Sequence, residues 1–166
     1  MSTIVCDIGP IIHLYEARCL QLLKQTGEIF IPHRVQLEVQ AAIHLDKQWP
    51  EWLNVVKLSL KEQTEAGAWQ ASRRLHAGEA EAIVLSKQKN ANWFLTDDPA
   101  TRLFVSVLGT EIRGSLGVVL WNAAKGHINR KETEEALDGL RQSSLWLSEN
   151  IYKEAREALD SIFKNS

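Results

Sequence analysis

The 166-residue sequence has no long hydrophobic run, few cysteines and little net charge. No stretch approaches the roughly 18 consecutive apolar residues of a membrane span, and charged residues interrupt the first apolar run, so neither a membrane anchor nor a signal peptide is expected. Cys6 and Cys19 lack CxxC or histidine spacing, which favours buried, reduced thiols in a cytoplasmic protein. A net charge of −2 provides no overall attraction to nucleic acid and leaves only local basic patches.

Short β-rich runs alternate with segments of helical hydrophobic spacing, and no repeat, low-complexity tract or linker divides them. This alternation predicts an α/β fold with a parallel sheet in one domain spanning 1–166, whose part from about 115 is mostly helical. The predicted strands are 3–7, 28–32, 55–60, 93–96 and 110–113, and the predicted helices are 9–27, 33–45, 61–75, 78–90, 99–109 and most of 115–163.

Carboxylates follow two of the predicted strands. Asp7 ends the first strand, and Asp97 and Asp98 follow "WFLT" at 93–96. Because ligands of an open parallel sheet bind at the carboxyl ends of its strands, these acids would face one crevice if the two strands are neighbours. An equally ordinary interpretation is helix capping, since Asp7 precedes "GPII" and Asp98 precedes Pro99 at a helix start.

Two predicted helices add further acids. Glu38 lies within an otherwise apolar helix face, and "GEAEA" provides Glu79 and Glu81. At about 100° per residue the last two lie on opposite flanks of their helix, so spacing alone does not choose between them. Clustered carboxylates repel one another unless a cation lies between them, and an all-oxygen ligand set suits Mg²⁺ or Mn²⁺. Such a site activates water for attack on a phosphoryl group.

Four segments in order, "DIGPIIHL", "IPHRVQLEV", "GEAEAIVLSKQKNANWFLTDDPATR" and "GSLGVVLWNAAKGHI", together resemble the PIN-domain superfamily, and most closely an uncharacterised prokaryotic branch related to VapC-type toxins. The resemblance covers residues 3 to about 128. It implies a three-layer α/β/α fold with a central parallel sheet of about four or five strands. It also implies an endoribonuclease that uses Mg²⁺ or Mn²⁺ to cut single-stranded or structured RNA.

The resemblance places the catalytic and metal-binding acids of that family on this chain. The four acids fall on Asp7, Glu38, Glu79 and Asp98, which selects Glu79 over Glu81. Asp97 is an additional candidate ligand, and Thr96 is implied to orient the site without binding metal. The chain departs from the family pattern after the first acid, where Ile8 and Gly9 replace the usual serine or threonine.

Cations near these acids are candidates for RNA binding, since phosphate contacts supply most non-specific affinity. The candidates are His33 and Arg34 beside the second strand, Arg102 after the aspartate pair and, as the strongest, Arg73, Arg74 and His76 upstream of Glu79. The resemblance further implies a homodimer and an antitoxin protein as partners. None of the five histidines has metal-ligand spacing, so they are interpreted as surface or partly buried polar residues.

Two other classes of protein compete with the nuclease hypothesis. A haloacid-dehalogenase-type phosphatase needs an aspartate two residues after the first, where this chain has Gly9, and a phosphoaspartyl receiver needs a late lysine that cannot be placed. The alternative outside enzymes is a degenerate PIN domain that serves as a protein- or RNA-binding module.

Overall fold

Short strands alternate with helices along residues 1–45, 48–73 and 75–164, which are the residues that the computed structural model describes. The strands are β1 (Thr3–Cys6), β2 (Glu28–Pro32), β3 (Leu53–Val56), β4 (Trp93–Leu95) and β5 (Glu111–Arg113). The helices are α1 (Ile8–Glu16), α2 (Gln21–Lys24), α3 (His33–Ala42), α4 (Leu60–Arg73), α5 (Ala77–Lys89), α6 (Pro99–Val107), α7 (Ser115–Ala124), α8 (Arg130–Gln142) and α9 (Glu149–Ile162).

The strands form one sheet in the order β3-β2-β1-β4-β5, and every pairing is parallel. The chain winds from β1 outward to β3 on one side, then crosses back to place β4 and β5 on the other side of β1. The strand order therefore reverses between β1 and β4. In open α/β sheets this topological switch point is where the crevice for ligands forms.

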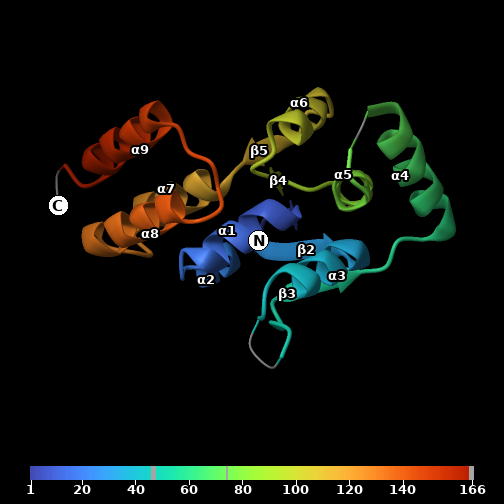
Figure 1. Cartoon of the computed structure of the whole chain (residues 1–166), viewed down its shortest axis with the longest axis horizontal. Coiled ribbons are helices and arrows are strands. Elements are labelled where there is room, and N and C mark those ends of the chain that lie inside the picture. The colour runs from blue at the N-terminus through green and yellow to red at the C-terminus, as the bar shows by residue number, and fades with distance from the viewer. Residues whose placement is uncertain (46–47, 74, 165–166) are drawn as a thin grey trace.

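Successive residues of each strand pack on opposite faces of the sheet. Ile4 and Cys6 of β1 join one core with α1, α3 and α7, whereas Val5 joins a second core with α4, α5 and α6. Figure 1 shows α7, α8 and α9 gathered on one side of the molecule and α4 and α5 on the other. Burial of both faces is the rule for parallel sheets. The predicted three-layer α/β/α fold is confirmed, with five strands in the central sheet.

Two predicted elements are wrong in their bounds. The single helix expected over 9–27 is two helices, because Arg18 adopts a left-handed conformation with φ of 61° and ends the α1 helix. The third strand covers Leu53–Val56 instead of 55–60. Its last partner is Pro32, where β2 ends, so the chain beyond Val56 has no strand to pair with.

In the part of the chain that the structure describes, no helix combines the length and apolar character needed to cross a membrane.

Candidate active site

Asp7 and the Thr96–Asp98 segment lie side by side at the switch point of the sheet. Cys6 pairs with Leu95 in the β1–β4 ladder, and the Asp7 N–H donates to the Leu95 carbonyl at 2.8 Å. Each strand therefore ends at the same level, and its next residue lies at the carboxyl edge of the sheet. The expectation that Asp7 and the aspartate pair come from neighbouring strands is met by this topology.

Thr96 joins the two strand ends. Its Oγ1 donates to Asp7 Oδ2 and accepts the Asp98 N–H, both at 3.1 Å, and its side chain is fully buried. The threonine thus fixes the Asp7 carboxylate relative to the backbone of Asp98. This geometry suits the orienting role that the resemblance implies for Thr96.

Asp7 is only 2% exposed, and no cation pairs with it among the described residues. Burial and, to a smaller extent, the nearby negative charges of Glu79 and Asp98 together raise the pKa of Asp7 to about 7. Hydrogen bonds from the Ile8 N–H, at 2.8 Å, and from Thr96 oppose this increase. The carboxylate therefore lies in a dry, negative environment that favours either a proton or a metal cation.

Glu38 approaches the start of α5 from α3. The Gly78 N–H donates to its carboxylate, and a Cβ built on Gly78 would lie only 2.5 Å from Glu38 Oε2 and 2.7 Å from Oε1. Only glycine at position 78 leaves room for this contact. Burial raises the pKa of Glu38, as do Glu79 and Glu81, while Arg34 and the Gly78 N–H lower it.

The two glutamates of "GEAEA" have different surroundings. Glu79 acts electrostatically on both Asp7 and Glu38, so it joins the acids of the switch point. Glu81 forms an ion pair with Arg34 of α3, with Nε and Oε2 2.6 Å apart. Their charged neighbours thus distinguish the two half-buried residues, since Glu79 lies near Asp7 whereas Glu81 is paired with a cation.

Asp97 contacts a different set of groups from Asp98. Its carboxylate accepts hydrogen bonds from the Ser115 N–H and from His13 Nδ1, both at 2.7 Å, and from Ser115 Oγ. Burial by itself would raise the pKa of Asp97, but these hydrogen bonds hold it below the ordinary value. Gly114 permits the approach, because a Cβ there would lie 2.6 Å from Asp97 Oδ1.

Sequence analysis missed His13 and Ser115 as part of the site. His13 was interpreted as a surface or partly buried polar residue, yet it joins α1 to the end of β4 through Asp97. No local sequence pattern points to this contact, because His13 and Asp97 lie 84 positions apart in the chain.

Comparison of the sequence with protein families identifies the family. A family model described as PIN domain matches residues 3–161. The chain belongs to the PIN-domain family. PIN domains are in general nucleases, and they typically use divalent metal ions. No curated protein matches the sequence significantly.

The helix-capping interpretation of the aspartates is confirmed in this PIN domain, because Asp7 and Asp98 are the N-caps of α1 and α6. Asp98 Oδ2 accepts from the Thr101 N–H and Oγ1 at 2.8 Å, and Glu79 Oε2 accepts from the His76 N–H at 3.1 Å. The second carboxylate oxygen of Asp98 and of Glu79 has no hydrogen-bond donor in the described part of the chain. Capping therefore orients these acids without exhausting their ability to bind a cation.

The acids fit a divalent cation in charge and in donor type. Asp7, Glu38, Glu79 and Asp98 are all oxygen donors, and a cation would relieve the repulsion that raises the pKa of Asp7 and Glu38. In their present conformations, however, no three carboxylate, histidine or cysteine side chains among the described residues converge closely enough to form a metal site. A cation would have to draw the exposed ends of these side chains together.

The expected RNA-binding residues are only partly described. Arg74 lies outside the described residues, and so does the side chain of Arg73. His76 is exposed at the start of α5, and its N–H bonds Glu79. Arg102 of α6 is exposed, and its Nη2 would lie 2.7 Å from a Cβ built on Gly114, which places the guanidinium beside Asp97.

Proposed function

We propose that this PIN domain is an endoribonuclease that depends on Mg²⁺ or Mn²⁺ and hydrolyses phosphodiester bonds of RNA. The observation that carries the proposal is the burial of Asp7 at the switch point, where Glu79 and Asp98 add negative charge instead of compensating it. A structural carboxylate would be expected to have a cationic partner there, whereas a metal ligand is expected to lack one until the ion binds.

Four acids would hold the ion, namely Asp7, Glu38, Glu79 and Asp98. When bound, a divalent ion neutralises phosphate oxygens and acidifies the attacking water. The chain itself orients the ligands through hydrogen bonds. Thr96 donates to Asp7, the Gly78 N–H at the start of α5 donates to Glu38, and the Thr101 N–H of α6 donates to Asp98. Because these contacts are made before substrate arrives, the reorganisation that metal binding requires is confined to the ends of the acid side chains.

Asp97 has a positioning role in this proposal. Its carboxylate accepts three hydrogen bonds from His13 and Ser115, which leaves it less able to serve as a ligand than Asp98. By joining α1, β4 and α7 it fixes the backbone that carries Asp98. Asp98 is therefore proposed as the fourth acid, and Asp97 as its support.

The test combines Mn²⁺ binding by calorimetry with cleavage of a mixed-sequence RNA. Asp7→Asn and Asp98→Asn are expected to lose Mn²⁺ binding and RNA cleavage. The control Asp160→Asn, which changes an acid that is 61% exposed on α9, is expected to keep both. Wild-type protein that binds no Mn²⁺, even with RNA present, would contradict the proposal and favour a binding module. Binding and cleavage that survive in Asp7→Asn would also contradict it.

The resemblance to VapC-type toxins supplies the remaining parts of the proposal. Under it, the protein acts as the toxin of a toxin–antitoxin pair, forms a homodimer and is inhibited by an antitoxin protein. Expression of the wild type in a bacterial host should then arrest growth, and expression of Asp7→Asn should not. Equal growth of both strains, at matched protein levels, would remove the toxin role and leave the nuclease activity to be judged by its own assay.

A further inference from the structure

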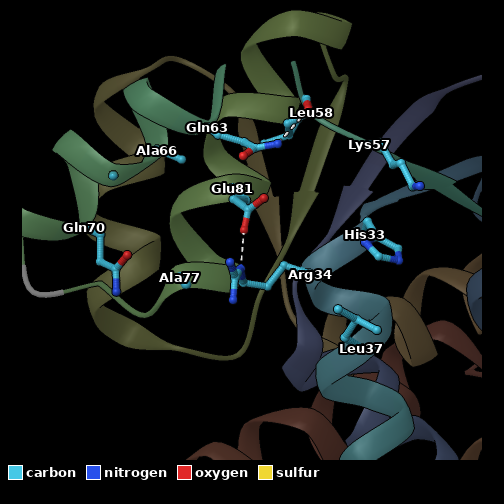
Figure 2. Close-up of a pocket in the computed structure, with 11 residues that line it drawn as sticks. His33, Arg34, Leu37, Lys57, Leu58, Gln63, Ala66, Gln70, Ala77 and Glu81 are labelled. Carbon is cyan, nitrogen blue, oxygen red and sulfur yellow. Dashed lines mark hydrogen bonds and ion pairs between the residues drawn. The ribbon is translucent and has the colours of Figure 1, made fainter. Parts of the chain in front are cut away.

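A groove of about 510 Å³ opens between α3, α4 and α5 (Figure 2). Its volume lies within the roughly 300–1,000 Å³ that is typical of small-molecule sites. None of the four proposed metal ligands lines it. It is therefore a separate surface, and nothing in the proposed chemistry accounts for it.

The groove begins beside Glu38, one of the proposed metal ligands. Arg34 lines the groove one helical turn before Glu38 on α3, and Ala77 lines it directly before Gly78, whose N–H binds Glu38. The charge of Arg34 also reaches Glu38, where it lowers the pKa. An RNA strand that extends from the acids over α3 and α5 would enter the groove without crossing another helix or strand.

Basic side chains follow the ends of β2 and β3, the two strands on this side of β1. His33 comes directly after β2 and Lys57 directly after β3, and both line the groove. Arg34 donates through Nε to Glu81, which orients the guanidinium, and no acceptor for its two terminal amino groups lies among the described residues. Figure 2 shows this ion pair across the groove, with His33 and Lys57 on one side of it.

The opposite wall provides apolar and amide surface. Gln63, Ala66, Gly67 and Gln70 lie three and four residues apart along α4 and all line the groove. Gln63 donates to the carbonyl of the buried Leu58, which holds its amide in place. Cations along one wall, with apolar and amide groups along the other, match the phosphate, ribose and base of a nucleotide.

We propose that this groove is a subsite for single-stranded RNA, which holds a nucleotide next to the scissile phosphate. The proposal rests on the proposed function, since it assigns the groove to the substrate of the same site. Lys57, His33 and the amino groups of Arg34 bind phosphate, while Leu58, Ala66 and the amides of α4 contact the nucleoside. A single strand is required, because bases paired in a duplex do not present their faces or edges to such a wall.

Two variants test the groove without touching the acids. Lys57→Gln removes an exposed cation, and its matched control is Lys131→Gln, which removes a cation that is 84% exposed on α8. Gly67→Leu adds bulk to the groove wall, where a Cβ would meet no atom within 4 Å. Leucine is also a better helix former than glycine, so this variant is expected to fold.

Binding is measured by fluorescence anisotropy with a labelled single-stranded RNA of about 12 nucleotides, in EDTA so that it is not cut. Lys57→Gln should weaken binding about 3- to 10-fold and lower the slope of log K against log salt by about 0.7, as expected for one phosphate contact. Gly67→Leu should weaken binding by about tenfold or more, with little change in the salt slope. Lys131→Gln should bind as the wild type does.

Cleavage with Mn²⁺ separates this proposal from the nuclease proposal. If both hold, the groove variants raise KM for the long RNA and leave kcat nearly unchanged. Wild-type affinity and KM in both groove variants would overturn the subsite while the nuclease stands. RNA binding that depends on the groove, without cleavage by the wild type, would retain the subsite and overturn the nuclease. Equal dependence on the groove for duplex RNA would overturn the assignment to a single strand.

Discussion

At the scale of single residues, the unusual feature of this PIN domain is a buried acid that the fold itself does not neutralise. The pKa of Asp7 is 3.8 in an ordinary environment and about 7 in the folded chain. The folded state therefore binds a proton more tightly than the unfolded state does. Between pH 4 and pH 7 this difference lowers the stability as the pH rises, and above pH 7 the full loss is present.

Asp7→Asn should therefore stabilise the protein when no metal is present. At pH 8 in EDTA we expect the variant to be more stable than the wild type by on the order of 4 kcal/mol, because the amide carries no charge to bury. At pH 4 the two proteins should be nearly equal. Urea unfolding followed by tryptophan fluorescence measures both, and a variant that is less stable than the wild type at pH 8 would show that Asp7 is a structural residue.

Substitution of the two neighbouring aspartates should lower the stability by different amounts. Asp97→Asn breaks the hydrogen bonds from His13 and Ser115 and should cost about 2–3 kcal/mol of stability. Asp98→Asn keeps an accepting cap for α6, since asparagine is a good N-cap, and should cost less than about 1 kcal/mol.

Mn²⁺ calorimetry on the same two variants completes this comparison. Asp98→Asn should lose most of its affinity for the ion, and folded Asp97→Asn should lose less. His13→Gln is the matched variant for Asp97, since it removes the same contact from α1 without changing an acid. The reverse order of affinities would assign the fourth ligand to Asp97.

Residue identity and order along the chain were enough to predict where the aspartates lie, but not what each one contacts. Asp7 and Asp98 follow strands that the apolar runs reveal. The contact of Asp97 with His13 and Ser115 joins residues 84 and 18 positions apart, and no local pattern contains it. The choice between Glu79 and Glu81 likewise depends on Arg34, which lies 47 positions from its partner.

At the scale of elements, the start of α5 positions an acid of the candidate site, as the ends of the strands do. Glu38 of α3 accepts the Gly78 N–H in the first turn of that helix, where the helix dipole also favours an anion. The absence of a side chain at Gly78 makes the contact possible. This explains the glycine of "GEAEA" in terms of packing, which the helical pattern alone does not.

Gly78→Ala should displace Glu38 even though alanine is the better helix former. We expect a loss of about 1–3 kcal/mol from overpacking and a weaker affinity for Mn²⁺. Gly117→Ala in α7 is the control, because its Cβ would lie 3.5 Å from the nearest atom and should stabilise the helix by up to about 1 kcal/mol. Thermal unfolding measures both changes. Stabilisation by both substitutions would show that the Glu38–Gly78 contact does not contribute to the stability of the fold.

The bounds of the elements show which local signals were reliable. Helices that begin at a cap and end at a turn, such as α5 and α6, were predicted to within about two residues. The break after α1 was not predicted, since the hydrophobic spacing continues through Arg18 and no glycine or proline marks the left-handed residue. The end of β3 depends on its partner β2 and so cannot be found from its own residues.

At the scale of the whole molecule, the parallel order β3-β2-β1-β4-β5 unites the separate observations. It brings the ends of β1 and β4 together for the acids, and it carries the ends of β2 and β3 along the same edge to the groove. Under the two proposals, one edge of the sheet holds the acids for a cation next to the groove whose basic side chains bind phosphate.

Stabilisation of the whole fold by Mn²⁺ should consequently depend on pH. A proton and the ion compete for Asp7, whose pKa is about 7 in the absence of metal. At pH 8 an ion concentration of 100 times Kd should stabilise the protein by about 2.7 kcal/mol, and at pH 5.5 the same concentration should stabilise it far less.

Thermal unfolding with and without Mn²⁺ at the two pH values measures this difference. In Asp7→Asn the effect of the ion should be small at both. An equal shift of Tm at pH 5.5 and pH 8 in the wild type would mean that the ion binds away from Asp7. The edge of the sheet where the strand order reverses would then no longer be the metal site, whatever the RNA assays show.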